Sequence, residues 1–172
     1  KNAWFLDASR GWVVAEGGLV FYTSDSGANW ALLRTLGVSL YDVCFRSAST
    51  GWVAGDGGFI AKSGDGGATW TPKTSGTSMP LCSIFFVDAN TGWAVGIAGT
   101  IVKSTDGGET WSPQTSGIAV TLNDVFFADA NNGWAVGANG IVVRTPDGGA
   151  PWVPQSWDSA ILTRVHFIDS LN

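Results

Sequence analysis

An eight-residue segment rich in turn-forming residues recurs four times along the chain. In the copy at residues 104–111 it reads Ser-Thr-Asp-Gly-Gly-Glu-Thr-Trp, and related copies lie at residues 23–30, 63–70 and 145–152. The tryptophans that close the copies lie 40, 41 and 41 residues apart. So regular a spacing indicates one supersecondary unit that is repeated along or around a structure. The sequence therefore predicts a repeat architecture.

Each period predicts four short β-strands. The first is an apolar run that ends in Phe, as at residues 84–86, and the second begins with Gly-Trp, as at residues 133–134. A tight hairpin containing Gly leads into a β-branched third strand such as residues 140–145, and the fourth follows the closing tryptophan. The first strand is apolar on both faces, so we expect it to be the most deeply buried. No segment has the apolar stripe of a helix, which predicts an all-β chain.

Four-stranded units that cover one another's faces favour a β-propeller over a β-sandwich or a β-solenoid. The predicted blades of this single partial propeller, residues 1–172, are residues 1–36, 37–76, 77–117 and 118–157, and residues 158–172 supply the first strand of a next blade. An open arc of blades would expose apolar sheet faces. We therefore expect the chain to be part of a larger propeller of roughly six to eight blades.

The charge balance argues against two classes of partner. The net charge is −5 and Lys and Arg form no cluster, so neither a nucleic-acid-binding nor an acidic-membrane surface is expected. Apolar runs end after a few residues, so no direct membrane insertion is expected. The chain lacks an initiator Met and a leader segment, which is typical of a processed or excerpted sequence.

The repeats resemble a known family. The pattern Ser/Thr-x-Asp-x-Gly-x-Thr-Trp resembles the Asp-box, or bacterial neuraminidase repeat. Its combination with Phe-x-Asp-Ala, Gly-Trp-Ala-Val-Gly and Gly-x-Ile is similar to the photosystem II stability/assembly factor-like propellers, most clearly over residues 128–137 and 140–152. The resemblance covers nearly the whole chain.

The resemblance implies a propeller, seven-bladed in the photosynthetic members, that lacks catalytic machinery and docks partners during assembly of a membrane complex. It also implies an extracytoplasmic location: secreted, periplasmic, cell-surface or in the thylakoid lumen. The arginine-rich surface of the photosynthetic members has no counterpart in this acidic chain, so the docking mode is implied but the partner is not.

The Asp-box residues are predicted to be structural. An Asp at the head of a turn accepts hydrogen bonds from backbone N–H groups a few residues on, glycines adopt the conformations that the turn needs, and the Trp packs beside it. Metal-binding and catalytic roles are the alternatives, but no metal or other cofactor is expected. The fourth turn, in which Pro151 replaces Thr, is expected to be distorted. The structural set is Asp25, Gly27, Trp30, Asp65, Gly67, Trp70, Asp106, Gly108, Trp111, Asp147, Gly149 and Trp152.

Few other carboxylates stand outside the repeat pattern. Glu16 and Asp56 occupy equivalent hairpins of successive repeats and are weak candidates for a ligand- or cation-binding patch, although solvated hairpin residues explain them as well. Glu109 lies inside an Asp-box, and Asp158 stands alone. A sialidase needs an arginine cluster and a Tyr/Glu pair, and other glycosidases need two facing carboxylates. Neither pattern is present, so no catalytic residue is predicted and the segment is not expected to be an enzyme.

His166 and the two cysteines have simple expected roles. His166 fills a first-strand position that is mostly aromatic elsewhere, so it is predicted to be a packing residue. Cys44 and Cys82 lie three positions out of register in neighbouring repeats and are expected to be buried, reduced thiols rather than a disulfide.

Three function classes remain open. The first is a non-catalytic interaction scaffold that binds a protein partner, a membrane complex or copies of itself through rim loops. The second is a secreted carbohydrate-active or glycan-binding propeller, sialidase-like or glycoside hydrolase-like. The third is a structural repeat of a cell-surface or extracellular assembly. Function is expected where the repeats differ, as in the Glu16 and Asp56 hairpins and the loops at residues 77–81 and 157–161.

Overall fold

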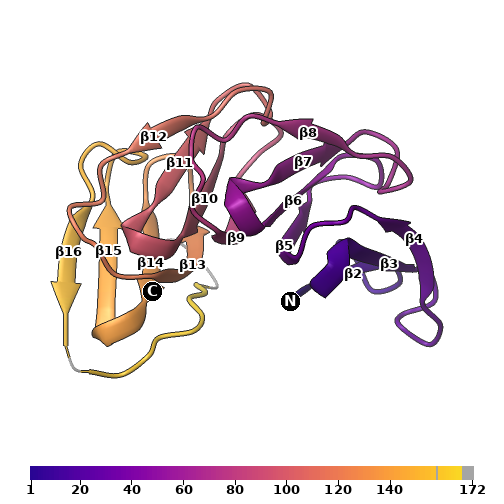
Figure 1. Ribbon diagram of the computed structural model, residues 1–172, viewed down its shortest axis with the longest axis horizontal. Helices are drawn as coiled ribbons and strands as arrows, with labels where there is room; N and C mark the ends of the chain where they lie inside the picture. The colour runs from indigo at the N-terminus through magenta and orange to yellow at the C-terminus, as the bar shows by residue number, and fades with distance from the viewer. Residues whose placement is uncertain (158, 168–172) are drawn as a thin grey trace.

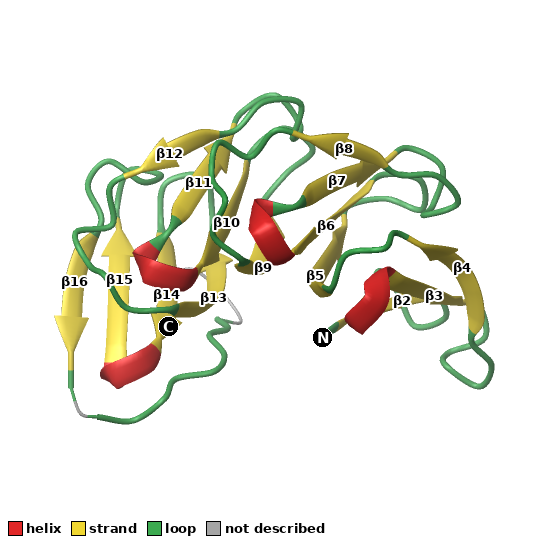
Figure 2. Cartoon of the chain, viewed as in Figure 1, coloured by secondary structure: helices red, strands yellow, loops and turns green. Residues whose placement is uncertain are grey.

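The computed structural model describes residues 1–157 and 159–167. Asp158 and residues 168–172, which include part of the predicted first strand of a next blade, lie outside the described residues. The described chain forms four antiparallel sheets of four strands, and within each sheet the strands are ordered as in the sequence. Helical segments in the described part are short turns between the second and third strands (Figure 2). The all-β prediction is confirmed.

The strand bounds repeat closely from sheet to sheet. Blade 1 consists of β1 (Ala3–Phe5), β2 (Gly11–Val14), β3 (Leu19–Thr23) and β4 (Ala31–Thr35), and blade 2 of β5 (Leu40–Phe45), β6 (Gly51–Gly55), β7 (Ile60–Ser63) and β8 (Thr71–Lys73). Blade 3 consists of β9 (Leu81–Phe86), β10 (Gly92–Gly96), β11 (Ile101–Ser104) and β12 (Ser112–Gln114), and blade 4 of β13 (Leu122–Phe127), β14 (Gly133–Gly137), β15 (Ile141–Thr145) and β16 (Val153–Ser156). The short turns are η1 (Glu16–Gly18), η2 (Asp56–Gly58), η3 (Ile97–Gly99) and η4 (Ala138–Gly140).

The four blades follow one another along an arc (Figure 1). Strands β5, β9 and β13 lie on the inner side of this arc, and β8, β12 and β16 lie on its outer side. The arrangement is that of β-propeller blades set around a common axis. Within the described residues, no helix is long and apolar enough to cross a membrane.

The apolar core is divided among the joints between neighbouring blades. Separate buried clusters lie between blades 1 and 2, blades 2 and 3, and blades 3 and 4. Residues that pair across the strands of a sheet make up these clusters. In one sheet, Ile84 pairs with Ala94, and Ala94 pairs with Val102 on the third strand. All three side chains are buried. Each blade thus contributes an apolar face to the next, as the repeat pattern predicted.

The most deeply buried strand is the second of each blade, so the expectation that it would be the first was wrong. Every residue of β6 and β10 is buried, whereas β9 has partly exposed residues at Cys82 and Phe85. The physical reason is the position of the first strand at the inner edge of its sheet, where it has a paired strand on one side only, so residues such as Cys82 and Phe85 stay partly exposed. The second strand has a paired strand on either side and a blade against each face.

Each joint is held by an aromatic clamp, which we define as the Gly-Trp indole of one blade and the Phe that ends the first strand of the next. The rings of Trp52 and Phe86 are stacked with centroids 3.6 Å apart, and the Trp52 indole N–H donates to the carbonyl oxygen of Gly107 in the next Asp-box. The same pair of contacts is made by Trp12 with Phe45 and Gly66, and by Trp93 with Phe127 and Gly148. Stacked aromatic pairs contribute roughly 0.5–1.5 kcal/mol beyond their burial.

Candidate functional site

The Asp-box carboxylates are engaged within their own turns. Asp106 accepts hydrogen bonds from the backbone N–H groups of Glu109 and Thr110 and from the hydroxyls of Ser104 and Thr110. These bonds, led by that from the Thr110 hydroxyl, hold the pKa of Asp106 well below its usual range. Asp65 is bonded in the same way to Thr69, and its pKa is lowered to about 2. The arrangement favours the structural role predicted for these residues.

The fourth Asp-box makes fewer of these bonds. Asp147 accepts hydrogen bonds from the Thr145 hydroxyl and the Ala150 N–H. The position that supplies an N–H and a hydroxyl in blades 2 and 3 is Pro151 here, which has neither donor. The Ala150–Pro151 peptide bond is cis. This turn differs from the others as the sequence predicted.

The closing tryptophans are buried to different extents. Trp111 and Trp152 are buried, whereas Trp30 is 38% exposed. Three of the four Gly-Trp tryptophans, Trp12, Trp52 and Trp93, are each at most 1% exposed, whereas Trp134 is partly exposed. The tryptophans that join the blades are therefore chiefly the second set, to which the motif analysis assigned no specific role.

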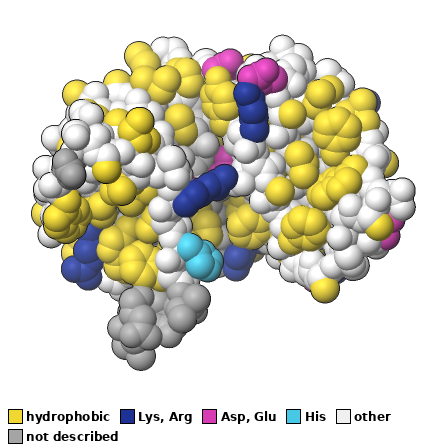
Figure 3. Space-filling model, turned by 90° about the horizontal axis from the view of Figure 1, so that it is seen from below, with side chains coloured by type: hydrophobic (Ala, Val, Ile, Leu, Met, Phe, Trp, Pro, Cys, Tyr) yellow, Lys and Arg dark blue, Asp and Glu magenta, His cyan; other side chains and the backbone are white. Residues whose placement is uncertain are grey.

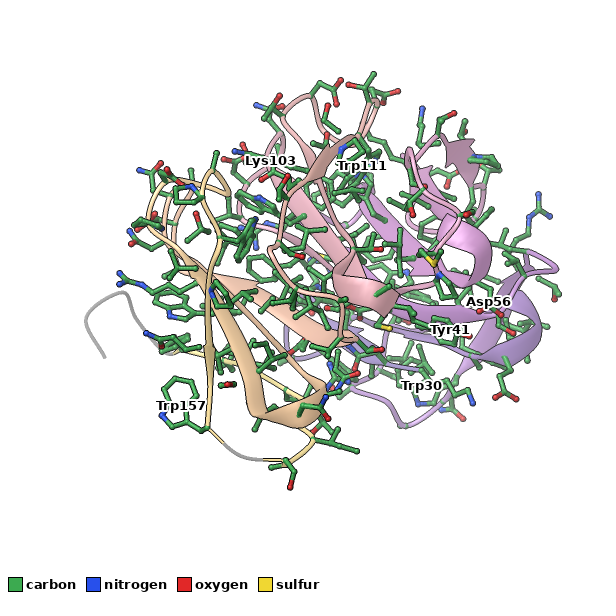
Figure 4. All side chains as sticks on the ribbon, turned by 60° about the vertical axis from the view of Figure 1, so that its left-hand side comes forward. Trp30, Tyr41, Asp56, Lys103, Trp111 and Trp157 are labelled. Carbon is green, nitrogen blue, oxygen red and sulfur yellow. The ribbon has the colours of Figure 1, made fainter. Side chains whose placement is uncertain are left out.

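Glu16 and Asp56 lie on neighbouring hairpins but do not share a partner. Glu16 forms an ion pair with the Lys1 ammonium, which lowers the pKa of Glu16. Asp56 accepts a 2.5 Å hydrogen bond from the Tyr41 hydroxyl, and this bond raises the pKa of Tyr41 to about 12. Figure 4 shows Tyr41 and Asp56 side by side. The structure thus gives each carboxylate a polar partner of its own in place of a common patch.

A chain of polar side chains links the inner strands across the blades. Asn2, Asp42, Ser83 and Asp124 occupy the same first-strand position in the four repeats. The Asn2 amide donates to Asp42 at 2.6 Å, and the Ser83 hydroxyl lies 2.9 Å from an oxygen of Asp42 and 2.9 Å from an oxygen of Asp124. Arg164, at the next equivalent position, donates to the Asn2 side-chain oxygen at 2.7 Å. Sequence analysis did not predict this network.

When Asp42 and Asp124 are both charged, the Ser83 hydroxyl has a single proton for two contacts, one with each carboxylate. A hydroxyl has one proton to donate, so Ser83 cannot donate to Asp42 and Asp124 at once. A proton on one carboxyl group resolves the conflict by donating to the Ser83 oxygen. Asp42 is the better site for it, because burial is the largest effect on Asp42 and raises its pKa. Asp42 is 5% exposed.

A pocket of about 380 Å³ opens at the inner edge of the blades. Its wall combines this polar network with aromatic side chains, including Trp4, Phe85, Phe126 and His166. The rings of Phe126 and His166 meet edge to face, with centroids 5.0 Å apart, and His166 itself is exposed. We call this feature the axial pocket. The polar residues that line it differ from blade to blade, whereas the aromatic clamps of the joints repeat.

Charged side chains are few on the face seen in Figure 3, where hydrophobic side chains gather between them. No cluster of three or more His, Cys, Asp or Glu able to hold a metal ion is found in residues 1–157 and 159–167. Both cysteines are free thiols. Cys44 is buried, and burial raises its pKa to about 12. Cys82 is only partly buried, because it lies on the less covered inner strand.

The fold and the repeated Asp-boxes define the class: a β-propeller built from Asp-box blades. Residues 33–112 match the family model described as Photosynthesis system II assembly factor YCF48. The resemblance to that assembly-factor family is therefore confirmed over these residues. No curated protein sequence matches the chain significantly.

Solved structures share the fold. "YCF48 bound to D1 peptide" is 20% identical, with a TM-score of 0.74 over 95% of this chain and 55% of that one. YCF48 from Cyanidioschyzon merolae is 22% identical, with a TM-score of 0.74 over 94% of this chain and 58% of that one. A GH74 enzyme from Niastella koreensis is 20% identical, with a TM-score of 0.69 over 86% of this chain and 28% of that one. The chain thus spans a little over half the length of the YCF48 chains, and these likenesses establish the propeller fold.

Proposed function

We propose that this chain is part of a non-catalytic propeller scaffold that docks a segment of a protein partner, in the manner of an assembly factor. The observation that carries the proposal is the likeness to YCF48, in the family match over residues 33–112 and in the fold. One of the similar YCF48 structures holds a D1 peptide. An extended peptide segment is accordingly the class of ligand that we assign to this chain.

The axial pocket and the adjoining rim hairpins are the proposed docking surface. They combine aromatic side chains with polar groups, which is typical of surfaces that bind peptides. They are also where the blades differ, so they supply the asymmetry that recognition of one segment requires. Glu16, Asp56 and Tyr41 lie on this rim as supporting polar groups. We place the protein outside the cytoplasm, with a membrane complex as the class of partner.

The rival function is glycan binding or hydrolysis, which the GH74 neighbours suggest. Glycoside hydrolysis requires an acid and a second carboxylate that flank the substrate. At the inner edge, the Ser83 hydroxyl instead lies between the two carboxyl groups, those of Asp42 and Asp124. Asp42 also accepts a hydrogen bond from the Ile84 backbone N–H, and Asp124 accepts one from the Val165 backbone N–H. This arrangement favours a scaffold over a hydrolase within the described residues.

A binding comparison tests the proposal. The chain is probed with an array of extended peptides that includes the D1 peptide, and separately with xyloglucan oligosaccharides. We expect saturable binding to one or more peptides and none to the oligosaccharides. His166→Ala, in the pocket wall, should weaken peptide binding, whereas Leu32→Ala, at a side chain 53% exposed on β4, serves as the control. Oligosaccharide binding without any peptide binding would overturn the proposal.

A further inference from the structure

The aromatic clamp is only half formed at blade 1, where Phe5 ends the first strand. In the other blades this position belongs to Phe45, Phe86 and Phe127. Those three rings are each at most 1% exposed, because the Gly-Trp indole of the preceding blade stacks on them. Phe5 is 45% exposed, and among the described residues no indole stacks on it. We call Phe5 and the Asp-box turn beside it, residues 23–30, the open clamp.

The rings of the open clamp already have the geometry of a filled joint. The ring of Trp30 meets that of Phe5 edge to face, with centroids 5.9 Å apart and planes at 84°. The filled clamp of blade 2 has the same distance and the same angle between Trp70 and Phe45. Binding of an indole would therefore require little rearrangement of these rings, which favours affinity.

The backbone acceptor for an indole N–H is also in place. In the filled joints that acceptor is the carbonyl oxygen of Gly66, Gly107 or Gly148. The equivalent residue of blade 1 is Ser26, which is exposed and has φ +64. Its N–H donates to the Ser9 carbonyl at 3.0 Å, as the Gly66 N–H donates to the Ser49 carbonyl at 2.8 Å. The turn is thus held as in blade 2, with the Ser26 carbonyl group at the position of the indole acceptor.

The place that an indole would fill is open beside Gly27. A Cβ added to Gly108, the equivalent residue of blade 3, would lie 2.4 Å from the indole nitrogen of Trp52. A Cβ added to Gly27 would meet no atom closer than 3.7 Å, and the nearest atoms belong to Trp30 of the same turn. The open clamp therefore combines a ring, an acceptor and free space where the filled joints contain an indole.

A second copy of the chain offers no unengaged Gly-Trp indole. Three of the four fill the joints between blades, namely Trp12, Trp52 and Trp93. The fourth, Trp134, lies against Phe167 with ring centroids 4.3 Å apart. Trp157 is 70% exposed but does not belong to a Gly-Trp strand, and Figure 4 shows it apart from Trp30. An indole for the open clamp is accordingly expected from a different protein.

We infer that the open clamp binds a tryptophan side chain on an extended segment of a protein partner. The indole would stack on Phe5 and donate its N–H to the Ser26 carbonyl oxygen. Trp52 makes the equivalent contacts with Phe86 and Gly107. The inference goes beyond the proposed function, because neither Phe5 nor Ser26 lines the axial pocket. The contact consists of ring stacking and one neutral hydrogen bond, so binding at the open clamp should depend little on salt.

A pentapeptide with the sequence of one of the chain's own Gly-Trp strands is a suitable probe. Ac-Thr-Gly-Trp-Ala-Val-NH₂ repeats residues 91–95, and an analogue with benzothienylalanine in place of Trp keeps the fused ring but lacks the N–H donor. The backbone amide signals of Ser26 and Gly27 in the ¹⁵N-labelled chain are followed by NMR as each peptide is added. We expect saturable shifts with the Trp peptide and about threefold to tenfold weaker binding of the analogue, the value of one hydrogen bond. Equal binding of the two peptides, or no shift with either, would overturn the inference.

Two variants of the chain test the same contact from the protein side. Phe5→Ala removes the stacking ring, and Gly27→Ala places a methyl group where the indole would lie. Each should weaken binding of the Trp peptide by about tenfold or more. Val153→Ala, at a side chain 49% exposed on β16, is the matched control and should bind as the wild type does. Melting curves identify the folded variants, and unchanged binding in a folded Phe5→Ala or Gly27→Ala would overturn the inference.

The other possible occupant is a second copy of the chain, which sedimentation of the chain alone tests. We expect a monomer over the concentration range of the titrations. A dimer that is lost both in Phe5→Ala and in Trp157→Phe would put the Trp157 of a second copy in the open clamp, and would contradict a partner tryptophan. Each of these results can occur while other peptides still bind at the axial pocket, so failure here is distinguishable from failure of the proposed function.

Discussion

The indole N–H of Trp52 donates to the carbonyl oxygen of Gly107 at 3.0 Å, although the two residues are 55 positions apart. This bond ties the second strand of blade 2 to the Asp-box turn of blade 3. Gly108 faces the same indole, because a Cβ added to it would lie 2.4 Å from the Trp52 nitrogen. The Gly-Trp and Asp-box motifs are therefore two halves of one joint, which explains why they recur with the same period.

Trp93→Phe is expected to lower the free energy of unfolding by about 2–4 kcal/mol. The variant loses the bond to Gly148, leaves that carbonyl without its donor and removes part of a stacked pair. Trp134→Phe is the matched control. Trp134 lies against Phe167 with a tilt of 35° and, in residues 1–157 and 159–167, donates to no Asp-box carbonyl. Urea unfolding should show the smaller loss for the control, and equal losses would contradict the role of the joint.

Replacement of the Asp-box carboxylates is expected to reduce stability in an order set by their hydrogen bonds. Asp106→Ala should lower the melting temperature more than Asp147→Ala, because Asp147 lacks the two bonds that Thr110 gives to Asp106. Peptide binding should survive in both folded variants. Thermal melts and peptide titrations of the two proteins provide the check. A variant with normal melting and lost binding would indicate a functional carboxylate.

Asp42→Asn should change how stability depends on pH above about pH 4. The raised pKa of Asp42 means that the folded state holds a proton which the unfolded chain releases. The contribution of this proton to stability is fully present below the pKa of Asp42 in the unfolded chain. It is lost as the pH rises through the pKa of Asp42 in the folded state. Denaturant unfolding at several pH values should therefore show a smaller decline with rising pH in Asp42→Asn than in the wild type.

Asp65→Asn is the control, because the pKa of Asp65 is lowered whereas that of Asp42 is raised. Its lowered pKa, about 2, contributes stability above the unfolded pKa that is lost as pH falls through the folded value. Asp65→Asn should therefore change how the free energy of unfolding depends on pH below about pH 4, and should leave that dependence unchanged at higher pH. Identical pH profiles for wild type and Asp42→Asn would contradict a proton held near Asp42. The side chains facing that carboxyl are those of Asn2, Ser83 and Asp124.

Ala98→Gly is expected to stabilise the protein by about 0.5–1 kcal/mol. Ala98 has φ +56 in an exposed hairpin, a left-handed conformation that its Cβ disfavours. The equivalent residues of blades 1 and 2 are Gly17 and Gly57. Asn139, also at φ +56, tolerates this region better, so Asn139→Gly should give a smaller gain. Denaturant titration measures the free energy of unfolding of both variants. A lower free energy of unfolding for Ala98→Gly would contradict backbone strain at this position.

The period and the motifs were enough to predict the propeller, because each repeat encodes four strands and the turns between them. The axial network could not be predicted in the same way. Asn2, Asp42, Ser83 and Asp124 are of different residue types and lie some 40 positions apart, and only the packing of blades brings them into contact.

The central claim, a scaffold that docks a protein segment, is tested most directly by calorimetric titration of the chain with its best-bound peptide from the array and with a xyloglucan oligosaccharide. The account predicts saturable heat with the peptide, a weaker response in His166→Ala, and no heat with the oligosaccharide. Saturable binding of the oligosaccharide together with no peptide response would contradict it.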